Sequence, residues 1–180
     1  MNIWKHFCTI TRHKLLVMRD CFKVGLYWQG LCHDLSKYGL TEFRLGCKYY
    51  IGTESPHNGE RRAYGYSLAW LHHKGHNRHH MEYWIDYEFG GQRCLTGMKM
   101  PKKYVLEMFI DRVSASKNYQ RQQYTDASAW EYYCRGRDHM VIHPASRALL
   151  EQLLLMLKEQ GERETYAYIK NTVRKIDFPY

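Results

Sequence analysis

The sequence predicts an all-α protein, and three observations carry this prediction. Apolar residues recur at helical spacing along most of the chain, and no segment shows the alternation of apolar and polar residues that is typical of a half-buried strand. The length of 180 residues is within the range of one domain and is enough to bury a hydrophobic core. We therefore expect a single compact helical domain over residues 1–180.

The first predicted helix covers about residues 8–26. Within it, His13, Val17, Cys21 and Val24 lie on one stripe at helical spacing. Because most of this stripe is apolar, it should face the interior, and His13 should be turned toward the core with it. A buried histidine there could simply donate one hydrogen bond to a carbonyl group.

The segment after this helix reads "GLCHDLSKY", residues 30–38. We expect a short helical stretch that ends near His33 and Asp34. A buried carboxylate must be paired or bound to a metal, or it changes its protonation state. Asp34 therefore requires a partner from elsewhere in the chain.

Start and stop signals divide the middle of the chain. Gly75 can end one helix, Asn77 can cap the next, and Pro101 suits the first position of a third. We therefore expect helices at about 41–50, 61–73, 77–87 and 101–119, with exposed loops at 51–60 and 88–100.

The C-terminal part carries no chemical signature. The stretch "ALLEQLLLMLKEQGERETYAYI" has the apolar periodicity of a packed helix followed by an amphipathic one. We expect residues of about 8–120 to carry any functional site, and the helices after them to buttress this core or to form the face of a homodimer. These helices are predicted at about 124–134, 144–160 and 162–174.

Composition limits the surroundings and the partners of the protein. The net charge of +9 favours an anionic partner, either a small phosphorylated molecule or a nucleic acid. No run of 18 apolar residues and no secretory signal occurs, so the simplest expectation is a cytoplasmic protein that does not span a membrane. The six cysteines form no C-x-x-C pair, and we expect most of them to be buried, free thiols.

The histidines are unusually dense. Five of them fall within "HHKGHNRHH", namely His72, His73, His76, His79 and His80. Neutral imidazoles and carboxylates are ligands for divalent transition metals, so that a metal ion could be the partner that Asp34 requires. Neighbours on a regular helix lie about 100° apart, so only one member of each adjacent pair should point inward. The cluster could also be merely solvated.

"HDLSK" resembles the signature of the HD-domain superfamily of metal-dependent phosphohydrolases. That resemblance implies an HD-domain-like all-α fold and a metal site made by His13, His33, Asp34 and Asp111. Some members of the superfamily bind a second ion through two further histidines. The candidates for these are His73 and His80, or His72 and His79.

A longer part of the chain, roughly residues 12–120, resembles an uncharacterised bacterial and phage family. The shared blocks are "GLYWQGLCHDLSKY", "SP" and "HHKGHNRHHMEYWIDY". This closer resemblance brings no known activity.

The HD-domain resemblance implies hydrolysis of a phosphoester. One divalent transition metal (Mn, Fe, Ni, Co or Zn), or two, would activate a water molecule as the nucleophile. Asp34 would be a ligand or the bridge between two ions. Lys37 would hold a phosphate oxygen or pair with Asp34, and His73 and His80 would bind the second ion or act as a general acid. Asp111 could alternatively pair with Arg112 or with another arginine.

The remaining alternatives concern the substrate and the class of activity. Sixteen tyrosines and five tryptophans, several beside the proposed ligands, favour stacking on a nucleobase and hence a nucleotide substrate. The same features would suit a non-catalytic module that binds a nucleotide or a nucleic acid. A di-iron oxygenase is a third alternative, and the close spacing of the extra histidines argues against it.

Overall fold

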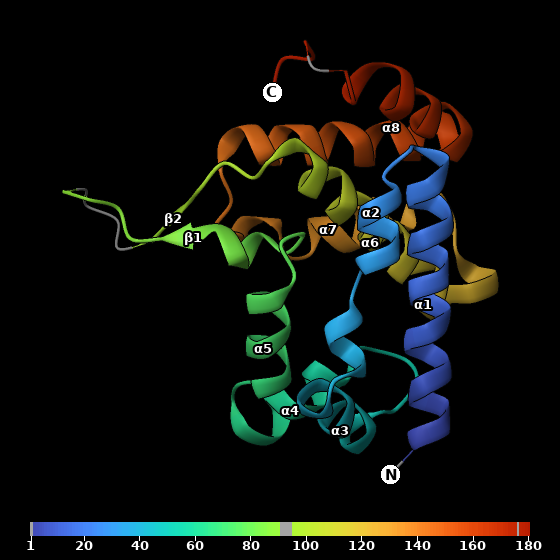
Figure 1. Ribbon diagram of the computed structural model, residues 1–180, viewed down its shortest axis with the longest axis vertical. Helices are drawn as coiled ribbons and strands as arrows, with labels where there is room; N and C mark the ends of the chain where they lie inside the picture. The colour runs from blue at the N-terminus through green and yellow to red at the C-terminus, as the bar shows by residue number, and fades with distance from the viewer. Residues whose placement is uncertain (1, 91–94, 176) are drawn as a thin grey trace.

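The computed structural model describes residues 2–90, 95–175 and 177–180. Helices dominate these residues, which confirms the predicted all-α class (Figure 1). Two strands of two residues each, β1 (Ile85–Asp86) and β2 (Thr96–Gly97), pair in antiparallel fashion. Strands of this length are too short to show the alternation of apolar and polar residues that the sequence lacks.

Helices α1 (Ile3–Lys23) and α2 (Tyr27–Cys32) form a hairpin. Gly25 turns the chain between them with a φ of 77°, a left-handed conformation that glycine adopts without a Cβ clash. The predicted stripe on α1 is confirmed, because His13 and the apolar residues that follow it at helical spacing are all buried.

The apolar core lies among α1, α6 (Lys102–Gln120) and α8 (Pro144–Tyr168). It is completed by α7 (Ser128–Cys134) and by a π-helical turn (Ile169–Val173). Four leucines of α8 are fully buried, so the C-terminal helix packs on the core as a buttress would. The four are Leu150, Leu153, Leu154 and Leu157.

The two C-terminal helices that we predicted are continuous except at one residue. Gly161 has a φ of 82° and a ψ of 174°, which interrupts α8 at the predicted junction. Short 3₁₀ helices, η3 (Arg121–Gln123) and η4 (Arg137–His139), flank α7.

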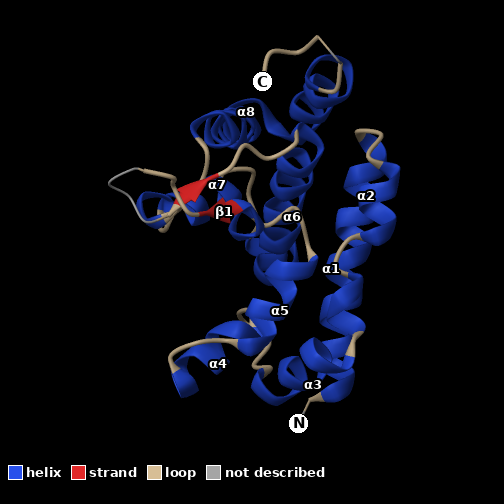
Figure 2. Ribbon diagram, turned by 60° about the vertical axis from the view of Figure 1, so that its left-hand side comes forward, coloured by secondary structure: helices blue, strands red, loops and turns tan. Residues whose placement is uncertain are grey.

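A second group of helices lies below this core in Figure 1, and the view in Figure 2 gives the same arrangement. The prediction of one helix over residues 61–73 was wrong, because Gly65 adopts a left-handed φ of 79° and ends a helix that already began at Pro56. The group consists of the 3₁₀ helix η1 (Leu35–Tyr38), α3 (Leu40–Tyr49), α4 (Pro56–Tyr64) and α5 (Leu68–His76).

Helices α3 to α5 have almost no apolar core of their own. Among their described residues, Cys47 and Ala69 are the only hydrophobic ones that are buried. Polar side chains are buried there instead. Between residues 33 and 79 these are His33, Asp34, Glu42, Glu60, Ser67, His73, Asn77 and His79.

The predicted helix over residues 77–87 is absent. Asn77 has an extended backbone (φ −120°, ψ 102°) and ends α5 instead of capping a new helix. The chain then turns, with the Trp84 indole donating to the Arg78 carbonyl at 2.8 Å, and Trp84 accepts from the Met98 amide at 2.6 Å. These contacts take the place of helical ones, and the segment forms the 3₁₀ helix η2 (Met81–Trp84) and β1.

Two expectations about the surface can also be compared with the structure. No helix in the described ranges has the length and apolarity needed to cross a bilayer. Of the five described cysteines only Cys21 and Cys47 are buried, so the expectation that most would be buried was wrong; Cys94 lies outside the described residues.

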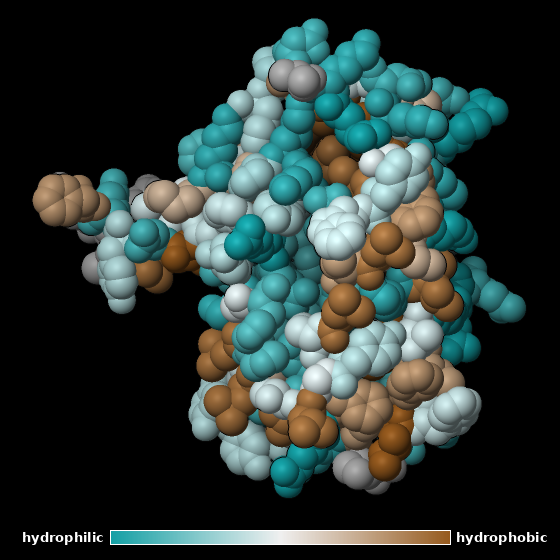
Figure 3. Space-filling model, viewed as in Figure 1, coloured by the Kyte–Doolittle hydropathy of each residue, from teal (hydrophilic) through white to brown (hydrophobic). Residues whose placement is uncertain are grey.

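Figure 3 shows apolar and aromatic side chains on the face over α1, α2 and α3, where Trp28 and Leu40 are exposed.

Candidate metal centre

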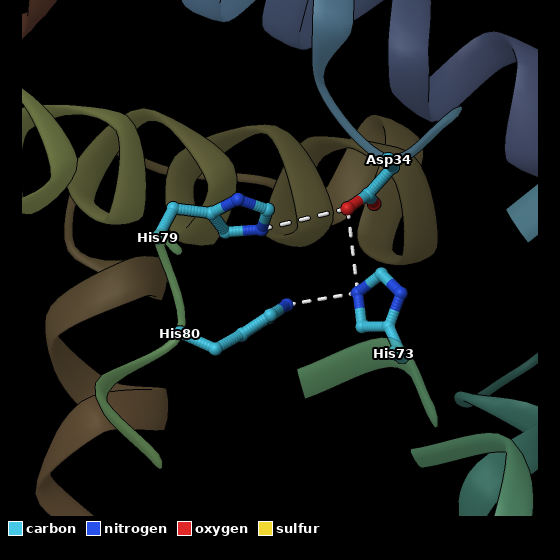
Figure 4. A group of neighbouring side chains, drawn as sticks. All are labelled: Asp34, His73, His79 and His80. Atoms are coloured by element: carbon cyan, nitrogen blue, oxygen red, sulfur yellow. Dashed lines mark hydrogen bonds and ion pairs between the residues drawn. The ribbon is translucent and has the colours of Figure 1, made fainter. Parts of the chain in front are cut away.

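Two sets of histidine and carboxylate side chains meet at Asp34. In each set the candidate ligand atoms all lie within 4.8 Å of one another. The first ligand set is His13, His33, Asp34 and Asp111. The second ligand set, drawn in Figure 4, is Asp34, His73, His79 and His80.

Asp34 stands where α2 gives way to η1, in a left-handed conformation (φ 55°, ψ 25°). Aspartate is one of the few non-glycine residues that tolerate this region. The conformation turns the chain out of α2 and aims the carboxylate inward, where its side chain is only 3% exposed. The two carboxylate oxygens then face different ligand sets.

In the first ligand set, Asp34 Oδ2 lies 3.6 Å from His13 Nε2 and 3.3 Å from His33 Nε2. Asp111, on the middle of α6, places Oδ1 2.9 Å from His13 Nε2 and 3.5 Å from His33 Nε2. The two imidazole nitrogens are 3.4 Å apart. Four atoms from α1, the end of α2 and α6 thus surround one point.

In the second ligand set, Asp34 Oδ1 lies 3.3 Å from His73 Nε2 and 3.5 Å from His79 Nε2. His80 Nε2 is 2.8 Å from His73 Nε2. His73 comes from α5, and the other two histidines come from the turn that follows it. Figure 4 shows the three rings and the carboxylate pointing toward a common space.

These distances fit the ligand shell of a divalent transition metal. Donor atoms bound at about 2.1 Å to one tetrahedral or octahedral ion lie roughly 3.0 to 3.4 Å from their neighbours. Ion pairs apart, neither oxygen of Asp34 has a hydrogen-bond partner, and His79 Nε2 has none either, although all three atoms are buried. Unpartnered buried donors and acceptors are costly, and metal ions would satisfy them.

Two further carboxylates orient the histidine rings. Glu107 Oε1 accepts from Nδ1 of His33 at 3.0 Å and lies 3.2 Å from Nδ1 of His79. Glu42 Oε2 accepts from Nδ1 of His73 at 2.8 Å. With each Nδ1 occupied in this way, the Nε2 atoms are left free to face Asp34.

Sequence reasoning missed both of these carboxylates. Glu107 had a signal, because it lies four residues before Asp111 and therefore on the same face of a predicted helix. Glu42 had none, because its contact with His73 depends on how α3 packs on α5.

The electrostatics of the centre favour ionised carboxylates. Burial alone would raise the pKa of Asp34, but the charges of His33, Lys37 and His73 hold that pKa well below its usual range. Burial likewise opposes ionisation of Asp111, and hydrogen bonds from histidines of the first ligand set hold its pKa well below the usual range. Both side chains are therefore in the state that binds a cation.

The histidines of the two sets differ. Burial disfavours a charge on His33, but Asp34 and Asp111 raise its pKa well above the usual range. Burial and the neighbouring His79 and His73 lower the pKa of His80 well below its usual range, so His80 is neutral. A neutral imidazole can bind a metal ion through its unprotonated nitrogen, but it does not act as a general acid near neutral pH.

Lys37 pairs with Asp34, its Nζ lying 2.6 Å from Oδ2. Burial would lower the pKa of Lys37, but the charge of Asp34 outweighs this effect and raises that pKa above its usual value. The side chain is therefore charged. A small cavity of about 40 Å³ borders Lys37, and its wall includes Glu42, His57 and Tyr119.

The structure brings together every histidine and carboxylate predicted for the first ligand set. The alternative for His13 was wrong, because its Nδ1 has no hydrogen-bond partner and its Nε2 contacts Asp111. The alternative pairing of Asp111 with Arg112 was wrong too, since the Arg112 guanidinium lies over the ring of Tyr133.

For the extra histidines the prediction was partly wrong. His73 points inward and His72 is a third exposed and contacts Glu42, as expected for neighbours on a helix. His79 and His80 both belong to the second ligand set, because they lie in a turn and not on the predicted helix. His79 and His80 are close to His73 in the sequence, and all three histidines nevertheless reach one shared site.

The fold and the site together define an all-α protein with paired histidine and carboxylate ligand sets that share one aspartate. A family model described as "Family of unknown function (DUF5662)" matches residues 2–156, and the chain belongs to this family. The match covers every residue of both ligand sets. No curated protein and no solved structure matches the chain.

Proposed function

We propose that this protein is a metal-dependent phosphohydrolase, related in kind to the HD-domain superfamily, that acts on a nucleotide or a related phosphoester. The observation that carries the proposal is the sharing of Asp34: one oxygen belongs to each ligand set. This arrangement suits two divalent transition-metal ions bridged by one carboxylate.

When bound, such a pair of ions supplies a nucleophilic water at neutral pH and offsets the charge that develops on a transferred phosphoryl group. The residues do the rest. Asp34 and Asp111 provide the anionic charge that holds the cations, and the neutral His80 completes the second ligand set. Glu42 holds the ring of His73, and Glu107 those of His33 and His79, in the tautomer that presents Nε2.

In this proposal His73 and His80 are ligands, and the role of general acid toward the leaving group does not fall to either. His73 Nε2 is directed at Asp34, and the lowered pKa of His80 leaves it without a proton to give at neutral pH. We therefore assign both to the proposed metal centre.

Lys37 is the residue we propose for substrate binding. Its side chain is 24% exposed and stands at the centre, and its pairing with Asp34 would weaken once cations take over the carboxylate. The ammonium group could then hold a phosphate oxygen. The adjoining cavity of about 40 Å³ is far smaller than the roughly 300 Å³ of an ordinary ligand pocket, so only the phosphate end of a nucleotide would enter.

A second candidate is a di-iron oxygenase. The observation in its favour is that the two ligand sets are contiguous, with histidines on both sides of a shared carboxylate. Imidazole and carboxylate ligands suit iron as well as manganese or zinc. The metal content and the reaction catalysed separate the two candidates.

The test begins with elemental mass spectrometry of the purified protein and of Asp34→Asn, a variant that keeps the shape of the side chain. Asp138→Asn, at a carboxylate that is 82% exposed, is the matched control. We expect about two equivalents of transition metal in the wild type and in the control, and loss of both in Asp34→Asn.

The loaded proteins are then assayed on phosphomonoesters, phosphodiesters and nucleotides. Phosphate release that requires Asp34 supports the hydrolase. Oxygen consumption by the iron-loaded protein without phosphate release would favour the oxygenase. Absence of metal even after reconstitution, with salt-sensitive binding of nucleic acid, would replace both proposals by a non-catalytic binding module.

A further inference from the structure

We propose that Glu107 couples the two ligand sets, so that both ions depend on this one carboxylate. The inference rests on the proposed metal centre but not on the reaction it catalyses. Glu107 is a positioning residue, because it contacts two histidines and no atom of the shared carboxylate.

The geometry singles out one oxygen. Glu107 Oε1 lies 3.0 Å from His33 Nδ1 and 3.2 Å from His79 Nδ1. His33 belongs to the first ligand set and His79 to the second. The two rings face each other with centroids 4.4 Å apart, so a single acceptor between them can reach both.

Burial makes these two contacts matter. The side chains of His33, His79 and Glu107 are 0%, 2% and 7% exposed. Solvent is therefore largely excluded from these contacts. Without it each ring would have a buried Nδ1 lacking a partner, or would move its proton to Nε2, where it would oppose a cation. Loss of Glu107 should therefore disturb one ligand in each set.

Glu42 offers a natural comparison, because it serves only one set. It accepts from His73 Nδ1 at 2.8 Å, while its other oxygen contacts His72, which belongs to neither set. Glu107 and Glu42 are both buried and both orient histidines. They differ in how many ligand sets they reach, and this difference is what an experiment can measure.

The test is a titration of the metal-free protein with Mn²⁺, in which calorimetry and electron paramagnetic resonance monitor the binding. The variants are Glu107→Gln, Glu42→Gln and, as control, Glu60→Gln. Glu60 is also buried but binds Ser67 and the backbone amides of α5, not a histidine ligand. Second-shell substitutions weaken metal binding by about 10- to 100-fold.

We expect Glu107→Gln to weaken both Mn²⁺ ions by such factors and to remove the spin-coupled signal of an ion pair. Glu42→Gln should weaken one ion only, and Glu60→Gln neither. If Glu107→Gln weakens one ion or none, the coupling is disproved. Glu107→Asp, which keeps the buried charge but is too short to reach both rings, should also weaken both ions and serves if Glu107→Gln does not fold.

The outcome for the wild type separates this inference from the proposed function. Two Mn²⁺ ions bound without hydrolysis of any phosphoester would leave the coupling intact and contradict the hydrolase. A wild type that binds no Mn²⁺ would overturn both.

Discussion

Asp34 shows how one residue can set the geometry of a whole site. Its left-handed backbone follows the end of α2 and turns the carboxylate toward five histidine rings. Two of these rings belong to the first ligand set and three to the second. Such conformations carry a cost of about 1 kcal/mol or more for a residue other than glycine, and they persist where the surrounding structure enforces them. Here the enforcing contacts include the pairs with Lys37 and the histidines.

Asp20 is a second buried carboxylate, and it lies outside the candidate metal centre. It is fully buried on α1 and pairs with Arg19, Lys23 and Lys117, while Tyr166 donates to it at 3.2 Å. Burial would raise its pKa, but Arg19, Lys117 and Lys23 lower the pKa to about 2. The contacts join α1 to α6 and α8.

The pH dependence of stability follows from this lowered pKa. The folded value lies below the unfolded value of about 3.9, so the contribution of Asp20 is present above pH 4 and is lost as the pH falls toward 2. We expect the wild type to lose about 2 kcal/mol through this group over that window. Asp20→Asn should be less stable by about 3 kcal/mol at pH 7 and should lose less on acidification.

Chemical denaturation of both proteins at pH 7, 4 and 2.5 measures this difference. Other carboxylates titrate in the same range, and the comparison of the two proteins cancels their effect. Equal acid sensitivity of wild type and Asp20→Asn would show that the pairing has no such role.

At the scale of elements, the hairpin of α1 and α2 positions the first ligand set. Gly30 on α2 lies so close to α1 that a Cβ there would be 3.0 Å from Cys21 Cβ and 3.2 Å from the Met18 backbone. This approach brings the end of α2, with His33 and Asp34, against α1 and His13. A larger side chain at position 30 would push the two helices apart.

Gly30→Val should therefore lower the free energy of unfolding by about 1 to 3 kcal/mol and weaken metal binding as well. The control is Gly75→Val, since a Cβ at Gly75 meets nothing within 4 Å. Thermal denaturation and Mn²⁺ titration measure the two effects. A Gly30→Val protein that is destabilised but binds Mn²⁺ like the control would separate packing of the hairpin from the site.

The elements that the sequence predicted well are those whose signals are local. The stripe on α1, the Pro101 start before α6 and the Gly161 break all depend on residues a few positions apart. The turn holding His79 and His80 depends instead on the contact of Trp84 with Met98 across β1 and β2. No helical periodicity reports such a contact, so the second ligand set could be predicted only in part.

At the scale of the molecule, the two halves are stabilised in different ways. The half around α6 and α8 has an apolar core, while α3 to α5 bury mainly polar groups that lead to the second ligand set. Glu42 and Asn77 provide hydrogen-bond partners for some of these buried polar groups. Buried atoms of Asp34 and His79, in contrast, have no hydrogen-bond partner. Metal binding should therefore stabilise α3 to α5 more than the core.

Removal of metal should thus affect α3 to α5 more than α8. In hydrogen–deuterium exchange we expect amides of α3 to α5 to exchange about 100-fold more slowly when Mn²⁺ is present at 100 times its dissociation constant. Amides of α8 should change little, and Asp34→Asn should show no response. Equal protection along the whole chain would contradict this division.

The position of α6 in the chain has a consequence for biosynthesis. All four residues of the second ligand set have been synthesised once His80 is added, whereas the first ligand set awaits Asp111. Glu107, one helical turn before Asp111, is the group that orients histidines on both sides. A nascent chain that ends before α6 would therefore lack Asp111 of the first ligand set and the carboxylate that orients His79 in the second.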